Sequence, residues 1–174
     1  MMRRFLFATV VVLGSIHVHA SVHADEVIGD VSPAELKEKL TSWGYEVFAH
    51  EDEADRPQLL VTKVSDDAAP ERQGMAIKML DCMPEDRAFY ERRCPSFQFR
   101  AFLTPGFPIK DKVYADWNRE FGHTRAFIKE GHPRLAWDVG LTGGVTWAYI
   151  RNAVSVWETE LAAYIDHLDA SVLD

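Results

Sequence analysis

SFQFRAFL, residues 96–103, alternates apolar and polar side chains and is the stretch that decides the fold. Gln98 and Arg100 fall on one face of an extended chain, and the opposite face carries Phe97, Phe99, Ala101 and Leu103. Alternation of this kind is typical of a strand with one buried face. Because Thr104-Pro105-Gly106 follows directly, we expect the strand to end in a turn there.

Further strands are expected on both sides of this stretch. The apolar, β-branched segment 59–64 is the clearest of them, and the others are residues 45–49, 75–80, 124–129 and 135–141. Polar loops separate the expected strands 45–49, 59–64 and 75–80. Between strands 124–129 and 135–141, Glu130-Gly131-His132-Pro133 has the composition of a hairpin turn.

A first helix is predicted over residues 33–43. Ser32 is the expected N-cap, Pro33 takes the first helical position, and Glu35 completes a capping box. Gly44 stands where a left-handed residue ends many helices.

Two more helices are predicted downstream. The second ends at Gly122, and its apolar face has residues four apart, namely Ile109, Val113, Trp117 and Phe121. The third is long and follows Gly143-Gly144, with Thr146 as its N-cap. Its expected buried stripe is Ile150, Val154, Trp157, Leu161, Tyr164 or Ile165, and Leu168.

The order of these elements defines the fold class. Hairpin-connected strands with helices gathered on one side imply an α+β fold rather than a wound parallel sheet. We expect an antiparallel sheet with flanking helices and a long C-terminal helix. The sequence shows no internal repeat or linker, so residues 25–174 are expected to form a single domain.

Residues 1–24 have the three parts of a cleavable secretory signal peptide. Arg3 and Arg4 give a positive start, residues 5–16 form an apolar run, and small residues precede cleavage after Ala24, with Ala20 as the second candidate site. The alternative is an uncleaved anchor, but a spanning helix needs about 20 apolar residues and histidines interrupt this segment too early. We therefore expect a periplasmic or secreted protein.

The net charge excludes two classes of partner. The 174-residue chain carries a formal charge of −8. Proteins that bind phosphate backbones need clustered Lys and Arg, and anionic lipids attract basic segments. We therefore expect that the mature protein binds neither nucleic acid nor membranes.

Cys82 and Cys94 are expected to form a disulfide. An isolated pair in an oxidising compartment usually does so, and closing a loop of this length stabilises a fold by about 3 kcal/mol. The alternatives are a redox dithiol, which calls for Cys-x-x-Cys spacing, and a closed zinc site, which calls for four ligands. Neither pattern is present.

No catalytic motif is found in the sequence. It has neither the Gly-x-Ser-x-Gly of nucleophilic hydrolases nor the Gly-x-x-x-x-Gly-Lys of phosphate-binding loops, and Gly143-Gly144 is interpreted as a tight turn rather than an anion site. His123 and His132 could meet across the hairpin, with Asp138, but surface or turn histidines are the preferred interpretation. We expect no catalytic residue, cofactor or metal.

Two aromatic residues lie away from the buried stripe of the last helix. Trp147 and Tyr149 stand near its start, where an exposed aromatic pair would indicate a partner surface. Packing over the hairpin is the alternative interpretation.

Short motifs in the second half carry a resemblance to a known family. They are Trp117-Asn118-Arg119, Phe121-Gly122, the strand 125–128, residues 135–141 leading into Gly143-Gly144-Val145, and the final helix with Trp157. They resemble the YbjN family, described as bacterial sensory-transduction regulators. The upstream region 74–102, with both cysteines, resembles the exported members of that family.

The resemblance implies a fold like that of type III secretion chaperones, which are often dimeric. Because the family has no established catalytic residues, Trp117, Asn118, Arg119, Asp138, Gly143 and Gly144 are interpreted as structural. In this interpretation Asn118 ties a helix to a loop, and Asp138 caps the last helix or the hairpin. Cytoplasmic relatives cannot rely on a disulfide, so a cytoplasmic regulatory role does not carry over together with the cysteines.

The leading hypothesis is a noncatalytic periplasmic binding or chaperone-like protein, monomeric or a homodimer. It would hold a protein partner on its sheet face or exposed helix ends. One alternative is a small-ligand sensor with an apolar pocket between the sheet and the last helix. The other is a hydrolase that uses scattered acidic residues with His123 or His132.

Overall fold

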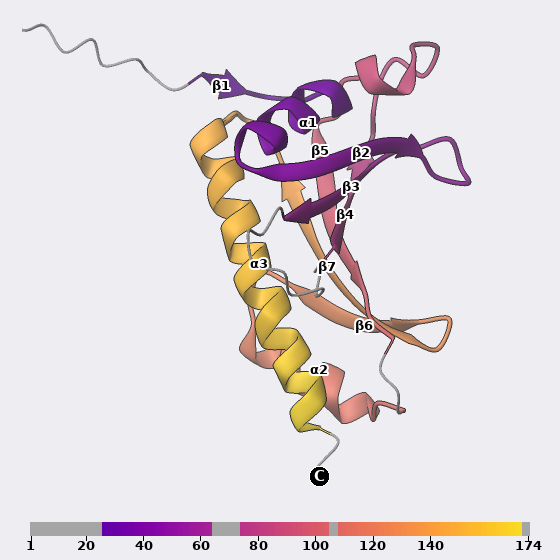
Figure 1. Cartoon of the computed structure of the whole chain (residues 1–174), viewed down its shortest axis with the longest axis vertical. Helices are drawn as coiled ribbons and strands as arrows, with labels where there is room; N and C mark the ends of the chain where they lie inside the picture. The colour runs from indigo at the N-terminus through magenta and orange to yellow at the C-terminus, as the bar shows by residue number, and fades with distance from the viewer. Residues whose placement is uncertain (1–25, 64–73, 105–107, 172–174) are drawn as a thin grey trace, which may run out of the picture.

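A computed structural model describes residues 26–63, 74–104 and 108–171 (Figure 1). The predicted signal peptide, the loop 66–73, the end of the 59–64 strand and most of the turn after residue 103 lie outside these residues.

An antiparallel sheet of six strands forms the centre of the described chain. The spatial order is β2-β3-β4-β5-β7-β6, so β5 and β7 are neighbours and β6 lies at the edge. The strands are β2 (Tyr45–Glu51), β3 (Pro57–Lys63), β4 (Gly74–Leu80), β5 (Ser96–Phe102), β6 (Arg125–Lys129) and β7 (His132–Gly140). All of the predicted strands are present.

Three α-helices flank the sheet: α1 (Pro33–Ser42), α2 (Asp111–Glu120) and α3 (Trp147–Ala170). In Figure 1, α3 runs along the sheet, with α1 near one end and α2 near the other. The Ser32–Glu35 capping box forms, and the Thr146 side chain caps α3 as predicted. The α+β class with an antiparallel sheet and a long C-terminal helix is therefore confirmed.

The core lies between the helices and one face of the sheet. Phe97 and Phe99 are fully buried, and the Trp157 ring of α3 stacks on Phe99 with centroids 5.4 Å apart. Trp117 of α2 packs against Tyr164 of α3, which is the buried member of the predicted Tyr164-or-Ile165 pair. The alternation in SFQFRAFL thus places its apolar side chains toward the helices.

Some short elements are absent from the sequence prediction. Strands β1 (Val27–Ile28) and β8 (Val145–Thr146) pair with each other and tie the N-terminal segment to the start of α3. A 3-10 turn, Phe89–Glu91, lies between the cysteines. Strands of two residues have no detectable period, so pattern reading cannot find them.

The predicted hairpin turn is shorter than expected. Only Glu130 and Gly131 turn, both with positive φ, and His132 and Pro133 already pair in β7. None of the helices in the described ranges combines the length and apolar composition that a membrane span requires.

Candidate functional site

The face of the sheet opposite the helices is the candidate functional site. Cross-strand partners share a face, and this face contains the residues that alternate with the buried Phe97 and Phe99. We call it the open sheet face and define it by Phe48, Leu60, Lys78, Gln98, Arg100, Phe102, Phe127 and Arg134. No described helix or strand lies across it: Phe48 is 60%, Phe102 52% and Leu60 46% exposed.

A buried lysine lies near the middle of this face. Lys78 of β4 is only 4% exposed, and its Nζ lies 3.4 Å from Oδ2 of Asp52. Burial lowers the pKa of Lys78, and the nearby charges of Arg100 and Arg56 lower it further, while Asp52 acts in the opposite direction. A buried charge of this kind needs its partner, so Asp52 fixes the position of the ammonium group.

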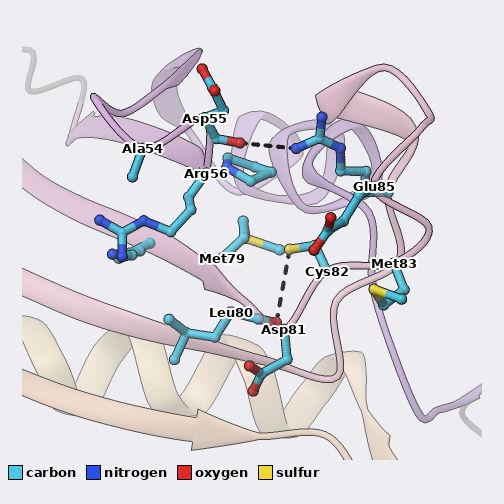
Figure 2. Close-up of a pocket in the computed structure, with 12 residues that line it drawn as sticks. Ala54, Asp55, Arg56, Met79, Leu80, Asp81, Cys82, Met83 and Glu85 are labelled. Atoms are coloured by element: carbon cyan, nitrogen blue, oxygen red, sulfur yellow. Dashed lines mark hydrogen bonds between the residues drawn. The ribbon is translucent and has the colours of Figure 1, made fainter.

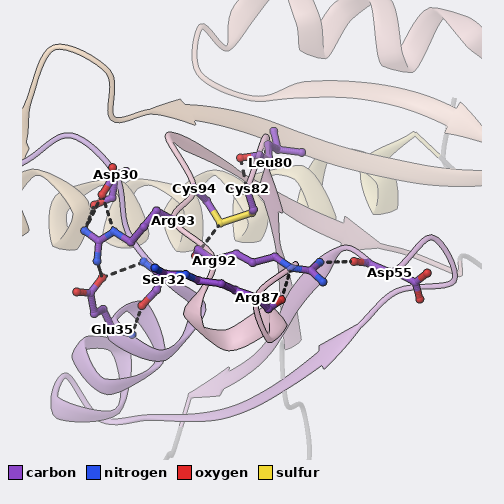
Figure 3. The surroundings of a disulfide bond; sticks show 10 residues. All are labelled: Asp30, Ser32, Glu35, Asp55, Leu80, Cys82, Arg87, Arg92, Arg93 and Cys94. Carbon is purple, nitrogen blue, oxygen red and sulfur yellow. Dashed lines mark hydrogen bonds and ion pairs between the residues drawn. A yellow bond between two sulfur atoms is a disulfide. The ribbon is translucent and has the colours of Figure 1, made fainter. Parts of the chain in front are cut away.

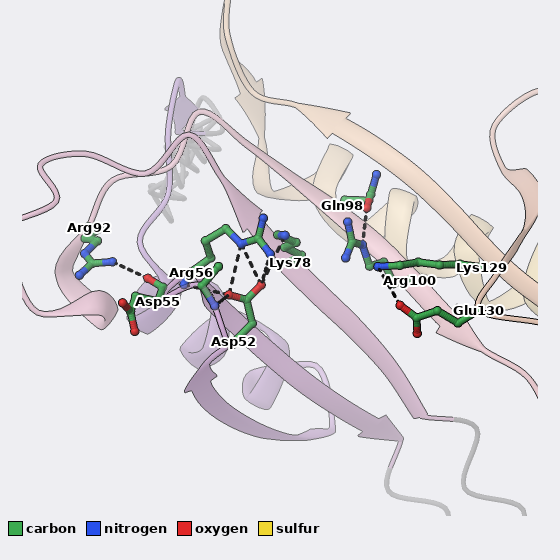
Figure 4. Close-up of polar contacts among 10 residues, drawn as sticks. Asp52, Asp55, Arg56, Lys78, Arg92, Gln98, Arg100, Lys129 and Glu130 are labelled. Carbon is green, nitrogen blue, oxygen red and sulfur yellow. Dashed lines mark hydrogen bonds and ion pairs between the residues drawn. The ribbon is translucent and has the colours of Figure 1, made fainter. Parts of the chain in front are cut away.

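Asp52 is in turn held by the turn between β2 and β3. Its carboxylate accepts hydrogen bonds from the backbone N–H of Ala54 at 3.0 Å and from Nε of Arg56 at 2.9 Å. Burial acts to raise the pKa of Asp52, but these hydrogen bonds and the charge of Arg56 outweigh it and hold the pKa well below the usual range. The Lys78–Asp52–Arg56 cluster is drawn in Figure 4.

A second polar chain crosses the neighbouring strands. Gln98 Nε2 donates to Oδ1 of Asp138 at 2.6 Å. Figure 4 shows the next bond, in which Arg100 Nε donates to Oε1 of Gln98. Asp138 therefore lies in the middle of β7 and orients Gln98, where the sequence had suggested a capping role. Burial lowers the pKa of Arg100, and the positive charge of Arg56 lowers it further.

The end of the face at β5, β6 and β7 holds a small pocket of about 100 Å³. We call it the arginine pocket, and its side chains are Arg100, Phe102, Phe127, Lys129 and Arg134. The Arg134 guanidinium lies over the Phe102 ring, with its central carbon 4.0 Å from the centroid. The Nε of Arg134 is buried and has no hydrogen-bond partner among the described residues, an arrangement that costs about 1–3 kcal/mol.

A larger pocket, of about 750 Å³, lies at the other end of β4 beside the disulfide (Figure 2). Its lining mixes both signs of charge: Asp55, Asp81 and Glu85 against Arg56, Lys78 and Arg92. Because the charges offset one another, its lining selects no particular charge of ligand.

The disulfide between Cys82 and Cys94 forms as predicted (Figure 3). Cys94 is fully buried, and its backbone exchanges hydrogen bonds with that of Val31, both at 3.0 Å. The next residue back, Arg93, pairs with Asp30 at 2.6 Å and with Glu35 at 2.5 Å. The cysteine loop thus joins the sheet to the start of α1.

The same loop also reaches the β2–β3 turn. Arg92 donates from Nη1 to the backbone oxygen of Asp55 at 2.9 Å and from Nε to that of Arg87 at 3.0 Å (Figure 3). The wall of the larger pocket is therefore fixed by the loop that the disulfide closes.

The candidate histidines do not meet. His123 and His132 lie at opposite ends of the β6–β7 hairpin, so the suggested pairing across it is wrong. The Nδ1 of His123 lies 2.8 Å from Oε1 of Glu160, a buried α3 residue whose other oxygen accepts from the Thr124 backbone at 3.1 Å. Within the described ranges no three His, Cys, Asp or Glu side chains are arranged to hold a metal ion.

Trp147 and Tyr149 do not form one exposed pair. Trp147 is half-buried and packs edge-on against Trp43 of α1, with centroids 6.4 Å apart, while Lys39 lies 5.1 Å from its ring. Tyr149 is 45% exposed. A partner surface at this helix end stays a prediction that involves Tyr149 more than Trp147.

The motif residues of the second half make structural contacts. Asn118 exchanges two hydrogen bonds with the backbone of Ala126, at 2.7 and 2.9 Å, so it ties α2 to strand β6 rather than to a loop. Trp117 donates to Thr124 at 3.1 Å, and Arg119 pairs with Asp116.

Gly143 and Gly144 form the turn before β8. Both have positive φ, and a Cβ added to Gly144 would lie 2.5 Å from Cγ1 of Val27. At this positive φ a residue with a Cβ is strained, and the Val27 side chain would have to move to make room for it.

No protein-family model, curated protein or solved structure matches this chain. The resemblance to the YbjN family therefore stays a prediction from the sequence.

Proposed function

We propose that this chain is an exported, noncatalytic binding protein of the YbjN type that holds a protein partner on its open sheet face. The observation that carries the proposal is the exposure of Phe48, Leu60 and Phe102 on the side of the sheet that no described helix covers. Exposed apolar side chains that gather on one face and are bordered by charges are typical of protein–protein contact sites. The signal peptide predicted from the sequence and the disulfide support a periplasmic location for this binding.

The fixed charges of the open sheet face favour recognition over catalysis. Lys78, Asp52 and Arg56 hold one another, and Asp138 holds Gln98. Such pairs set the orientation and specificity of a complex more than its raw affinity.

The small-ligand alternative is less well supported. The space between α3 and the sheet, where an apolar pocket was considered, holds the fully buried rings of Trp157 and Phe99 in stacked contact. The hydrolase alternative, acidic residues with His123 or His132, is also less well supported: the acidic side chain that contacts His123 is Glu160, which is buried and also accepts a hydrogen bond from the Thr124 backbone.

Site-specific photo-crosslinking in the periplasm tests the proposal. A photoreactive phenylalanine analogue replaces Phe48 or Phe102 on the open sheet face, and Ala162, exposed on α3, serves as the matched position on the helical side. We expect the same protein to be captured from both sheet positions and not from Ala162.

The capture should also depend on the apolar surface. Leu60→Ser, close to Phe48 in the register of β2 and β3, should reduce capture from the Phe48 position without unfolding the protein. Equal capture from both sides of the molecule, or none from the sheet, would contradict the proposed function. Capture of a second copy of this chain would identify the homodimer as the partner.

A further inference from the structure

The arginine pocket has an unusual charge for this chain. The whole protein carries −8, yet three cationic side chains, Arg100, Lys129 and Arg134, line this one small hollow. Its lining includes no acidic residue. Outside the lining, Glu130 lies 3.9 Å from the Lys129 ammonium, and Asp138 and Asp52 act on Arg100 without forming an ion pair with it.

Arg134 lines the pocket with a guanidinium whose Nε has no hydrogen-bond partner among the described residues. The cation lies over the Phe102 ring, so the planar group is fixed in one orientation. A carboxylate binds a guanidinium through two parallel hydrogen bonds, and because Nε is buried the two Nη groups are the donors left for such a pair.

Arg100 adds a second oriented cation. Its Nε is occupied by Gln98, which Asp138 holds in place, so the Nη groups are left for a ligand. Among the described residues Arg100 forms no ion pair; the charge of Arg56 lowers its pKa, while the charges of Asp138 and Asp52 act in the opposite direction. An anion here would give the Arg100 guanidinium a direct ion-pair partner, which none of the described residues provides.

The two phenylalanines beside the pocket and the pocket volume indicate which groups surround the bound carboxylate. Phe102 is half exposed and Phe127 is partly exposed, so both offer apolar surface beside the cations. The volume of about 100 Å³ is well below the roughly 300–1,000 Å³ of pockets that enclose small molecules. The pocket therefore fits one acidic side chain of a larger partner, whose neighbouring apolar groups lie on the phenylalanines.

We propose that the arginine pocket recognises a carboxylate flanked by apolar residues in a peptide segment of the protein partner. This inference rests on the proposed function, because it names the chemistry of the segment that the open sheet face holds.

The test is an NMR titration of the mature protein that follows the arginine Nε–Hε signals. The probe is the blocked peptide acetyl-Phe-Glu-Phe-amide, and acetyl-Phe-Gln-Phe-amide is its neutral match. We expect the glutamate peptide to shift the Arg134 signal, and to bind about tenfold more tightly than the glutamine peptide, because a hydrogen bond to a charged group is lost.

Substitutions of the two arginines test whether the glutamate peptide binds in the arginine pocket. Arg134→Gln and Arg100→Gln should each weaken binding of the glutamate peptide by about tenfold, while Lys37→Gln, the same charge change on exposed α1, should leave it unaltered. Equal binding of the two peptides to the wild-type protein would overturn the proposal without reliance on any variant. Binding that neither arginine variant changes would overturn it as well.

The failure of this inference is distinguishable from the failure of the proposed function. If Arg134→Gln leaves the crosslinks from Phe48 and Phe102 intact, a partner binds the open sheet face and the pocket does not select it. If the wild-type protein gives no such crosslinks, the proposed function itself is wrong.

Discussion

Asp52 shows how a single side chain can organise this surface. It is the acceptor shared by Lys78, Arg56 and the backbone of its own turn, so one carboxylate fixes the β2–β3 turn and a buried ammonium group together. Without the carboxylate, Lys78 would keep a charge that is 4% exposed and has lost its partner. A buried charge whose partner is removed destabilises a fold far more than a surface ion pair stabilises it.

The lowered pKa of Asp52 predicts a specific loss of stability in acid. An unfolded aspartate titrates near pH 3.9, and in the folded protein the pKa lies below that value. The contribution of Asp52 is therefore fully present above about pH 4 and is lost as the pH falls toward its folded pKa. Urea unfolding between pH 2 and pH 6 should show a steeper fall in the wild-type midpoint than in Asp52→Asn.

The comparison rests on the slope against pH, because Asp52→Asn also lowers the stability at neutral pH. Parallel curves for the two proteins below pH 4 would show that this carboxylate is not the acid-sensitive group.

The burial of Glu160 could not be predicted from the sequence. The buried stripe of α3 was predicted from its apolar residues, and Glu160 lies within that stripe although it is charged. Its partners, His123 and the Thr124 backbone, are 37 and 36 residues away along the chain. Local spacing contains no information about such a contact, so a surface position was the natural expectation.

The loop between Cys82 and Cys94, the cysteine loop, contacts several elements of the fold. Its disulfide closes a sequence separation of 12, and Arg92 and Arg93 extend from it to the β2–β3 turn and to α1. Replacing both cysteines with alanine should lower the free energy of unfolding by about 2–4 kcal/mol. Guanidinium unfolding of the oxidised wild type against Cys82→Ala/Cys94→Ala measures this difference.

Hydrogen exchange of the double variant should also locate the damage. The backbone N–H groups of Val31 and Cys94, which bond to each other's carbonyls, should lose protection, while those of β3 should keep it in proportion to global stability. A reductant gives the internal control, since it should destabilise the wild type and leave the double variant unchanged. A uniform loss of protection across the sheet would contradict a local role for the loop.

The strands show why the fold was predictable and half of the site was not. Alternation in SFQFRAFL correctly placed Arg100 opposite the buried Phe97 and Phe99. Arg134 was missed, because Pro133 reads as a turn residue and the predicted strand began at residue 135. In the structure Pro133 is the second residue of β7, so Arg134 joins the open sheet face.

The order of the strands in the sheet could not be predicted from the sequence either. The arginine pocket exists because β7 lies between β5 and β6. Nothing in the spacing of the segments shows that the chain returns from the edge strand to pair with β5. A sequence gives the face on which a residue lies, but not its neighbours across the sheet.

For the whole molecule, the helices and the open sheet face divide structural from binding roles. The three helices bury their apolar stripes against one face, which accounts for the large aromatic core. The other face keeps exposed phenylalanines beside oriented charges. A single-layer sheet with one free side usually exposes polar residues there, so the apolar residues on this side are the feature that calls for a partner.

The predicted signal peptide has a testable consequence for export of the 174-residue chain. Expression of all 174 residues in a Gram-negative host should yield a periplasmic protein that begins at Asp25, because cleavage is expected after Ala24. Its two cysteines should react with an alkylating reagent only after reduction. Intact-mass measurement of the periplasmic fraction, with and without reduction, gives both results.

A matched chain without residues 1–24 should stay in the cytoplasm with reactive cysteines, since that compartment keeps thiols reduced. Recovery of the uncleaved chain in the membrane fraction would contradict the signal-peptide assignment, and would place the open sheet face and its partner in a different compartment.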